Sequence, residues 1–256
     1  MGSLYNRCQS CPQRHSGICM ALNDEQHKRL ALISRRRMVS AHTMIFSDGD
    51  NADYYANVLS GIVKLVKTLG DGRQHIIGLL YPPDFLGQPF GRRHSFSAEA
   101  ETDVELCTFP RQGFLAVLAE FPQLEHRLYE FTLRELDNCR DWNLLLSRKQ
   151  AYERVASFIL LMARRVLMTS SHLGATNHVK FTLPMTRAEI ADYLGLTLET
   201  VSRQMSQLKR KSVIMLPSSR EIVVPDIERL SAIAKLENCG RCFDDPETAP
   251  LIRAAG

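Results

Sequence analysis

The sequence lacks any apolar run long enough to cross a membrane. Its longest such run, from Val155 to Ala163 with Ser157 tolerated inside it, is far shorter than the roughly 20 residues of a helical span. Met1 to Arg7 contains no apolar core of a signal peptide. Internal repeats and low-complexity segments are also missing. We therefore expect the protein in the cytoplasm.

Motifs of the common enzyme classes are missing as well. The sequence has no nucleophile motif, no glycine-rich phosphate loop and no paired acid and base. Its 256 residues, 45% of them apolar and 23% charged, have the composition of an ordinary globular protein with one or two domains. These absences predict a protein that is not an enzyme.

The segment from Met185 to Lys211 has the pattern of two short helices joined by a turn at Gly195. Thr186, with Glu189 three residues later, has the spacing of a capping box, and Thr197 is the expected cap of the second helix. Apolar residues recur at helical spacing in both helices: Ile190, Ala191 and Leu194 in the first, and Leu198, Val201, Met205 and Leu208 in the second. The segment predicts a helix-turn-helix. The alternative is a structural helical hairpin whose charges are only solvated.

The start of the second helix would present side chains to base edges in the major groove of DNA. Glu199, Ser202 and Arg203 lie there, and Arg can bond guanine while Glu accepts from cytosine. The other predicted DNA contacts are Thr197, Thr200, Arg187 and Lys209. Between positions 148 and 220 there are 12 Lys or Arg against 4 Asp or Glu, a net +8 in a chain of net +4. This excess fits the neutralisation of phosphates.

Seven cysteines in a reducing compartment favour metal binding or redox chemistry over disulfides. Cys8, Cys11 and Cys19 form a C-x2-C-x7-C pattern in a polar segment, and thiolates suit zinc or an iron-sulfur cluster. Three ligands leave one coordination position open, and Cys107 on a predicted strand is our candidate for it. The alternative is three unligated surface thiols, with Cys107 a small core residue.

A helix is predicted from Asn23 to Ser34, with Asn23 as its cap, and a small antiparallel barrel or jelly roll after it. The expected strands are separated by turn sequences such as Asp-Gly and Ser-Gly: Met44–Phe46, Tyr54–Leu59, Ile62–Thr68, His75–Tyr81 and Val104–Phe109. Alternation places Cys107 on the strand face opposite Val104 and Leu106. The predicted fold class is α+β.

A long helix is predicted from Pro122 to Ser147. Six of its positions recur at spacings of three and four, as in the seam of a two-stranded coiled coil: Tyr129, Thr132, Leu136, Cys139, Asn143 and Leu146. Because Thr and Asn interrupt the stripe and acidic residues surround it, association through this seam would be conditional. The alternative is a helix packed only against its own barrel.

The C-terminal part is predicted to contain a helix from Gln150 to Leu167, a loop from Ser170 to Val179 and, after the helix-turn-helix, a hairpin wing. The wing strands would be Val213–Leu216 and Glu221–Val224, and Asp226 would begin a last short helix. Cys239 and Cys242 form a C-x2-C that we interpret as idle thiols rather than ligands. The expected domains are a cysteine-rich cluster-binding segment (1–22), a β-barrel sensor domain (23–121), a dimerisation helix (122–149), a winged helix-turn-helix domain (150–238) and a tail (239–256).

Five motifs resemble the CRP/FNR family of bacterial transcription regulators, and its FNR branch in particular. They are FSDGD at Phe46–Asp50, LSG at Leu59–Gly61, DFLG at Asp84–Gly87, LLLSRK at Leu144–Lys149 and GLTLETVSRQ at Gly195–Gln204. The resemblance covers nearly the whole chain. It implies a jelly-roll sensor domain like those that bind cyclic nucleotides, a dimer formed through the long helix, and a winged helix-turn-helix on DNA.

The FNR branch further implies an oxygen-responsive homodimer that activates transcription with RNA polymerase. An E-x-x-S-R motif in this branch recognises two-fold sites with TTGAT-like halves, and Glu199, Ser202 and Arg203 match it. The resemblance also implies an oxygen-labile [4Fe-4S] cluster on Cys8, Cys11, Cys19 and Cys107, whose intact form favours the dimer. The seven residues between Cys11 and Cys19 exceed the spacing of the best-known members.

Cyclic nucleotide binding is not expected. CRP-type pockets hold ribose with a Gly-Glu pair and the cyclic phosphate with an Arg-Ser pair, whereas this chain has Gly87-Gln88 and His94-Ser95 at those places. Without the Arg, the phosphate has no bidentate partner. Two other functions stay open: a DNA-binding regulator with structural zinc or another redox signal, and an iron-sulfur electron carrier.

Overall fold

The structure is a computed structural model that describes residues 8–169 and 178–235. The described chain divides into two compact units, and the division falls between Leu133 and Arg134, inside the long helix α4 (Pro122–Arg148). No helix within the described residues is long and apolar enough to span a membrane. Each unit is considered by itself below.

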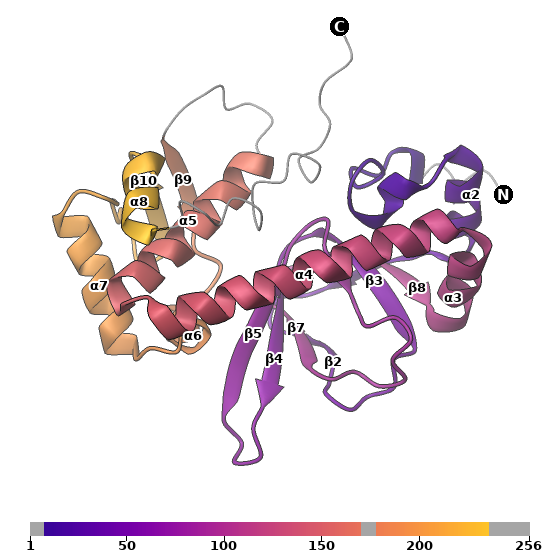
Figure 1. Cartoon of the computed structure of the whole chain (residues 1–256), viewed down its shortest axis with the longest axis horizontal. Coiled ribbons are helices and arrows are strands. Elements are labelled where there is room, and N and C mark those ends of the chain that lie inside the picture. The colour runs from indigo at the N-terminus through magenta and orange to yellow at the C-terminus, as the bar shows by residue number, and fades with distance from the viewer. Residues whose placement is uncertain (1–7, 170–177, 236–256) are drawn as a thin grey trace, which may run out of the picture. The chain divides into compact units, whose positions relative to one another are not determined.

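The first unit is built around two four-stranded antiparallel sheets (Figure 1). One sheet has the order β1-β8-β3-β6, and the other has the order β2-β7-β4-β5. The strands are β1 (Arg35–Val39), β2 (Met44–Phe46), β3 (Tyr54–Ser60), β4 (Val63–Thr68), β5 (Gln74–Leu80), β6 (Phe85–Leu86), β7 (Ser97–Ala100) and β8 (Val104–Pro110). A core with apolar residues from both sheets lies between them, which confirms the predicted jelly-roll type of fold.

Alternation along the strands gives the first sheet two apolar faces. In β8, Val104 and Leu106 enter the core between the sheets, while Cys107 and Phe109 belong to a second cluster on the opposite face. The predicted orientation of Cys107 is therefore confirmed. The turn at Gly61 permits no side chain, because its φ is +81° and a Cβ would lie 2.2 Å from the Asp103 carbonyl oxygen.

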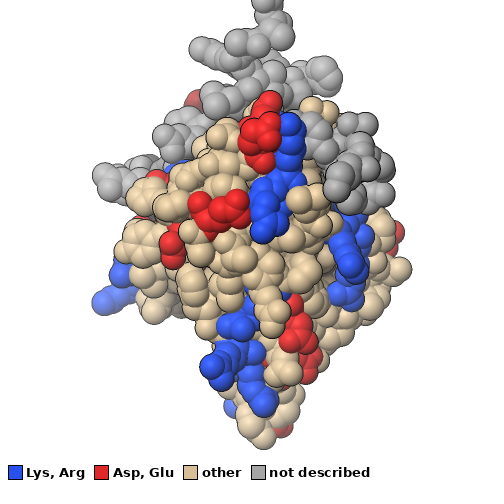
Figure 2. Space-filling view, turned by 90° about the vertical axis from the view of Figure 1, so that its right-hand side faces the viewer, with Lys and Arg blue, Asp and Glu red and all other residues tan. Residues whose placement is uncertain are grey.

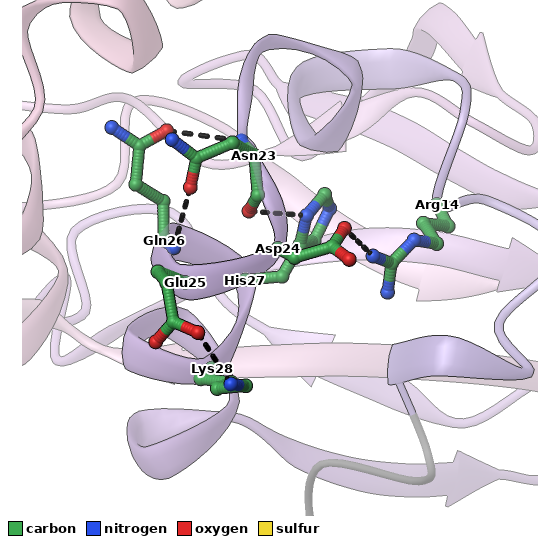
Figure 3. A network of polar contacts seen from close by, with 7 residues as sticks. All are labelled: Arg14, Asn23, Asp24, Glu25, Gln26, His27 and Lys28. Atoms are coloured by element: carbon green, nitrogen blue, oxygen red, sulfur yellow. Dashed lines mark hydrogen bonds and ion pairs between the residues drawn. The ribbon is translucent and has the colours of Figure 1, made fainter.

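Helices cover this second face. The covering elements are η1 (Gly17–Ala21), α2 (Asp24–Ile33), α3 (Arg111–Glu120) and the first part of α4. They contribute Ile18, Leu30, Phe114 and Leu124, all almost completely buried, to one apolar cluster. Helix α2 begins where it was predicted, since the Asn23 side chain accepts from the Gln26 amide and the Gln26 side chain accepts from the Asn23 amide (Figure 3).

The second unit contains the end of α4, four further helices and a two-stranded sheet (Figure 1). The elements are α5 (Ala151–Thr169), β9 (Val179–Thr182), α6 (Arg187–Leu194), α7 (Leu198–Arg210), β10 (Glu221–Val224) and α8 (Ile227–Ala234). Helix α5 forms the centre of the unit, and its residues from Val155 to Ala163 are all buried. The last short helix was predicted to begin at Asp226, and Asp226 is the cap of α8.

Some elements differ from the predictions. The strands β1, β6, β7 and β9 and the helix α3 were not predicted. The predicted wing hairpin is confirmed at one position, where Met215 and Val223 form an antiparallel bridge with two backbone hydrogen bonds. Along its whole length, however, β10 pairs with β9 rather than with Val213–Leu216. Most of the predicted loop lies outside the described residues, and Val179 at its end belongs to β9.

Candidate functional site

The helix-turn-helix is held by the predicted caps. The Thr186 hydroxyl accepts from the Glu189 amide, and the Glu189 carboxylate accepts from the Thr186 amide. Gly195 ends α6 in the left-handed conformation with φ of +60°. The Thr197 hydroxyl then accepts from the Thr200 amide at 3.2 Å and begins α7. Two helices separated by so short a turn form the expected motif.

The inner face of α7 differs from the prediction at one position. Val201, Met205 and Leu208 are buried as expected, but Leu198 is 52% exposed. Gln204 is also buried, so the buried face of α7 is formed by Val201, Gln204, Met205 and Leu208 and does not include Leu198. The inclusion of Leu198 in the apolar face was therefore wrong.

The outer face of α7 presents the predicted base-reading residues. Glu199, Ser202 and Arg203 are all exposed, and their spacings of three and four place them on one side of the helix. Lys209 near the end of α7 and the cap residue Thr197 are exposed too. An exposed polar row at the start of the second helix is the geometry that direct readout of DNA requires.

Two of the predicted DNA contacts have partners within the protein. Arg187 is only partly exposed and donates to the Ser219 carbonyl oxygen at 3.3 Å, in the turn before β10. Burial lowers the pKa of its guanidinium. The Thr200 hydroxyl accepts from the Thr197 hydroxyl at 2.9 Å. These contacts give both residues a structural role, and their contact with DNA stays a prediction.

Electrostatics join Cys8, Cys11, Cys19 and Cys107 into one group of thiols in the first unit. Burial is the largest cause that raises the pKa of Cys8, Cys19 and Cys107, the last to about 12. The next cause is the charge of neighbouring thiols, since Cys19 is affected by Cys107, Cys11 and Cys8, and Cys107 by Cys8 and Cys11. Such charge effects fall with distance. Cys19 and Cys107 also pack against the same apolar cluster, which agrees with these charge effects in placing the N-terminal cysteines near the barrel cysteine.

Several side chains hold this group in place. Arg14, between the second and third cysteines in sequence, pairs with Asp24 in the first turn of α2 (Figure 3). Arg36 lies opposite Cys107 in the β1–β8 pair and donates to Glu105 at 2.7 Å. On the other side of β8, Asn57 lies opposite Cys107 and donates to the Cys19 sulfur at 3.5 Å. Asn57 was missed in the sequence, although it is a polar residue within an otherwise apolar run of β3.

The donor set fits an iron-sulfur cluster. No three His, Cys, Asp or Glu side chains in residues 8–169 and 178–235 are grouped as ligands of a metal ion. A [4Fe-4S] cluster would take one Cys thiolate on each of its four irons, so its ligands are spread more widely than those of one ion. Four neighbouring thiols are present, and positive iron would offset the burial and repulsion that disfavour their thiolate forms.

The predicted seam of α4 is largely uncovered within each unit. Tyr129 is 60% exposed in the first unit, and Leu136 is 45% exposed in the second. Thr132, Cys139 and Asn143 are exposed, and Leu146 is partly exposed. The first part of α4 packs in its own unit through Leu124 and Leu128, and a dimer contact through the exposed positions stays a prediction.

Gln88 and Ser95, which stand where CRP-type pockets have residues that bind the nucleotide, are in contact. The Ser95 hydroxyl donates to the Gln88 side-chain oxygen at 2.9 Å. His94 is buried and stacks on Phe46 with ring centroids 3.5 Å apart, and burial lowers the pKa of its imidazole. A neutral, stacked His offers a phosphate neither the charge nor the fork of an Arg.

Charged side chains of the described residues are interspersed on the surface seen from the right-hand side of Figure 1. In that view Lys and Arg lie beside Asp and Glu in small groups separated by uncharged areas (Figure 2).

Comparisons with known proteins agree with this architecture. Residues 36–121 match the cyclic nucleotide-binding domain and residues 153–233 the Crp-like helix-turn-helix domain. A probable transcriptional activator of Rhizobium leguminosarum bv. viciae is 44% identical over 223 residues, 87% of this chain and 91% of that protein. The transcriptional activator protein FnrL of Cereibacter sphaeroides is 41% identical over 89% of this chain and 92% of its own. The structure of FixK2 from Bradyrhizobium japonicum is similar with a TM-score of 0.69 and 34% identity, over 78% of this chain and 97% of that one. The chain therefore belongs to the FNR branch of the CRP/FNR family of transcription regulators and is not an enzyme.

Proposed function

We propose that this regulator is an oxygen-responsive activator of transcription whose cysteine group holds a [4Fe-4S] cluster. With the cluster intact, the cytoplasmic protein forms a homodimer and binds two-fold TTGAT-like sites, where it acts with RNA polymerase. The observation that carries the proposal is the packing of Cys19 and Cys107 against one apolar cluster, where Asn57, opposite Cys107 in register, donates to the Cys19 sulfur at 3.5 Å. Relatives named as transcriptional activators support the activating role.

In this proposal the exposed residues Glu199, Ser202 and Arg203 of α7 bind DNA. Arg203 would bond a guanine, Glu199 would accept from a cytosine amino group, and Ser202 would contact either a base or the backbone. Lys209 and the basic segment around it would neutralise phosphates. In a homodimer two such helices would meet a two-fold site at half-site spacing. The exposed seam of α4 would form the contact between the two chains.

The cysteine group can influence α4 through a shared core. Cys19 packs against the apolar cluster that contains Ile18 and Leu22, and the same cluster contains Leu124 and Leu128 of α4. Holding the N-terminal thiols against Cys107 fixes Ile18 and Leu22, and with them the first turns of α4. When bound, the cluster would supply the reactivity toward oxygen. If the N-terminal thiols were no longer held against Cys107, the first turns of α4, where the seam begins, would be packed less tightly.

Analysis of iron and sulfide in protein purified without oxygen tests the proposal. The wild type should contain about four iron and four sulfide per chain. Cys11→Ser and Cys107→Ser should contain far less, because each removes one ligand. Cys139→Ser is the matched control, since Cys139 is an exposed thiol on α4, and it should keep the full content. A wild-type protein that contains zinc and no sulfide would contradict the cluster.

A further inference from the structure

Asn57 is a buried polar residue inside a strand of apolar neighbours. It is 3% exposed in β3, where Ala56 and Val58 point into the core between the sheets. Asn57 therefore points to the opposite face, where Phe85 of β6 and Cys107 of β8 are its neighbours in register. Polar side chains are buried at such places at a cost in stability, so their presence calls for a partner.

The partner of its amide group is a cysteine sulfur. The Asn57 Nδ2 donates to the Cys19 Sγ at 3.5 Å. The Oδ1 atom has no hydrogen-bond partner among the described residues, although it is buried. A buried carbonyl oxygen without a hydrogen-bond partner destabilises a fold. A structural role alone therefore does not explain Asn57, because a leucine of similar size would fill the site without that cost.

We propose that Asn57 is a positioning residue for the iron-sulfur cluster, whose amide N–H donates to the Cys19 thiolate and holds it in its ligating orientation. This inference rests on the proposed function, in which Cys19 is a cluster ligand. Hydrogen bonds to a charged acceptor are stronger than those to a neutral one. The contact consequently stabilises the ligating thiolate more than the free thiol.

The location of Cys19 explains why this ligand needs such support. Cys8 and Cys11 lie in one turn, joined by a bond from the Cys11 amide to the Cys8 carbonyl oxygen at 3.3 Å, and Cys107 is fixed in β8. Cys19 lies in the short helix η1, and seven residues separate it from Cys11. Partners outside the ligand set of this kind orient metal ligands, and the hydrogen bonds that sulfur accepts tune iron-sulfur clusters.

Two variants separate positioning from folding. Asn57→Leu removes both the donor and the unmet carbonyl, and Asn57→Asp keeps the shape but replaces the donor with a negative charge. Asn51→Asp, at an exposed amide of the same barrel, is the control for the change of charge. Each protein is loaded with cluster without oxygen, and the release of iron to an excess of a ferrous chelator is followed. Thermal unfolding of the cluster-free forms reports on the fold.

We expect Asn57→Leu to release iron on the order of 10-fold faster than the wild type, while its cluster-free form unfolds at an equal or higher temperature. Asn57→Asp should release iron at least as fast as Asn57→Leu, and Asn51→Asp at the wild-type rate. If both Asn57 variants released iron at the wild-type rate, the proposed role of Asn57 would be wrong, and the proposal of a cluster would be unaffected. A wild type that takes up no iron and sulfide would overturn the proposed function, and the role of Asn57 with it.

Discussion

The indole ring of Trp142 stacks on the phenol ring of Tyr193, with ring centroids 4.3 Å apart and an angle of 27° between the planes. Trp142 belongs to the last part of α4, and Tyr193 to the first helix of the helix-turn-helix. Leu145 is buried nearby in sequence, and the Lys149 ammonium donates to the Ser157 hydroxyl at 3.0 Å. The end of α4 is therefore part of the DNA-binding unit, so a displacement of α4 would also displace α6.

A double-mutant cycle measures this stacking. Trp142→Leu, Tyr193→Leu and the double variant should give a coupling energy of about 0.5–1.5 kcal/mol in urea unfolding, because an aromatic pair adds that much beyond buried area. Trp142→Leu combined with Tyr129→Leu, in the first unit, is the control and should be additive. A Trp142–Tyr193 coupling near zero would show that the stack does not hold the two helices together.

Arg203 should determine the choice of base in the half-site. Arg203→Leu is expected to weaken binding to a TTGAT palindrome by about 1–3 kcal/mol and to relax the preference at guanine. Binding titrations with each base at that position give both numbers. Arg73→Gln, which removes an exposed Arg in the barrel, should leave both unchanged. An Arg203→Leu protein with wild-type preference would remove Arg203 from the interface.

Thr197 should stabilise the recognition helix through its hydroxyl. Thr197→Ala loses the bond to the Thr200 amide and should lower the free energy of unfolding by about 0.5–2 kcal/mol. Thr197→Ser keeps an accepting hydroxyl and should unfold close to the wild type, and so should the exposed Ser206→Ala. If Thr197→Ala were as stable as Thr197→Ser, the cap would contribute nothing.

Glu153 should make the second unit sensitive to acid. Its pKa is lowered, first by the bond from Lys235 and then by the bond from the Gln150 amide. A lowered pKa means that the contribution of the carboxylate is present above the ordinary pKa of Glu and is lost as the pH falls through the folded-state pKa. Glu153→Gln should therefore be less stable than the wild type at pH 7.

The same comparison in acid and in a second background checks the cause. The difference between Glu153→Gln and the wild type should vanish once the pH lies below the folded-state pKa of Glu153. In a Lys235→Met background the substitution should cost less at pH 7, because its main partner is gone. A difference that stayed constant with pH would assign the effect to packing instead.

Local chemistry made much of the second unit predictable. Thr186, Thr197 and Asp226 cap their helices where expected, because a cap depends only on a side chain and on backbone amides within the next turn. Strand pairing was harder to predict from the sequence. The partner of β10 is β9, which lies more than one helix-turn-helix away in sequence, and no local pattern specifies so distant a pairing.

The first unit shows the same division. The orientation of Cys107 follows from alternation along a single strand. Strand β1 was missed because Arg35, Arg36, Arg37 and Met38 are exposed at a sheet edge, so that only Val39 carries an apolar signal. Asn57 could not be connected with the cysteines, since its position depends on the register between β3 and β8.

The affinity for a TTGAT palindrome, measured at one stated salt concentration before and after exposure of the same cluster-loaded sample to air, tests the central claim most directly. A palindrome with altered half-sites is the control for nonspecific binding. We predict that loss of the cluster weakens specific binding by about 5- to 150-fold, the usual range of coupling between two sites, and abolishes the preference for the palindrome. Equal affinity with the cluster intact and lost would contradict the account.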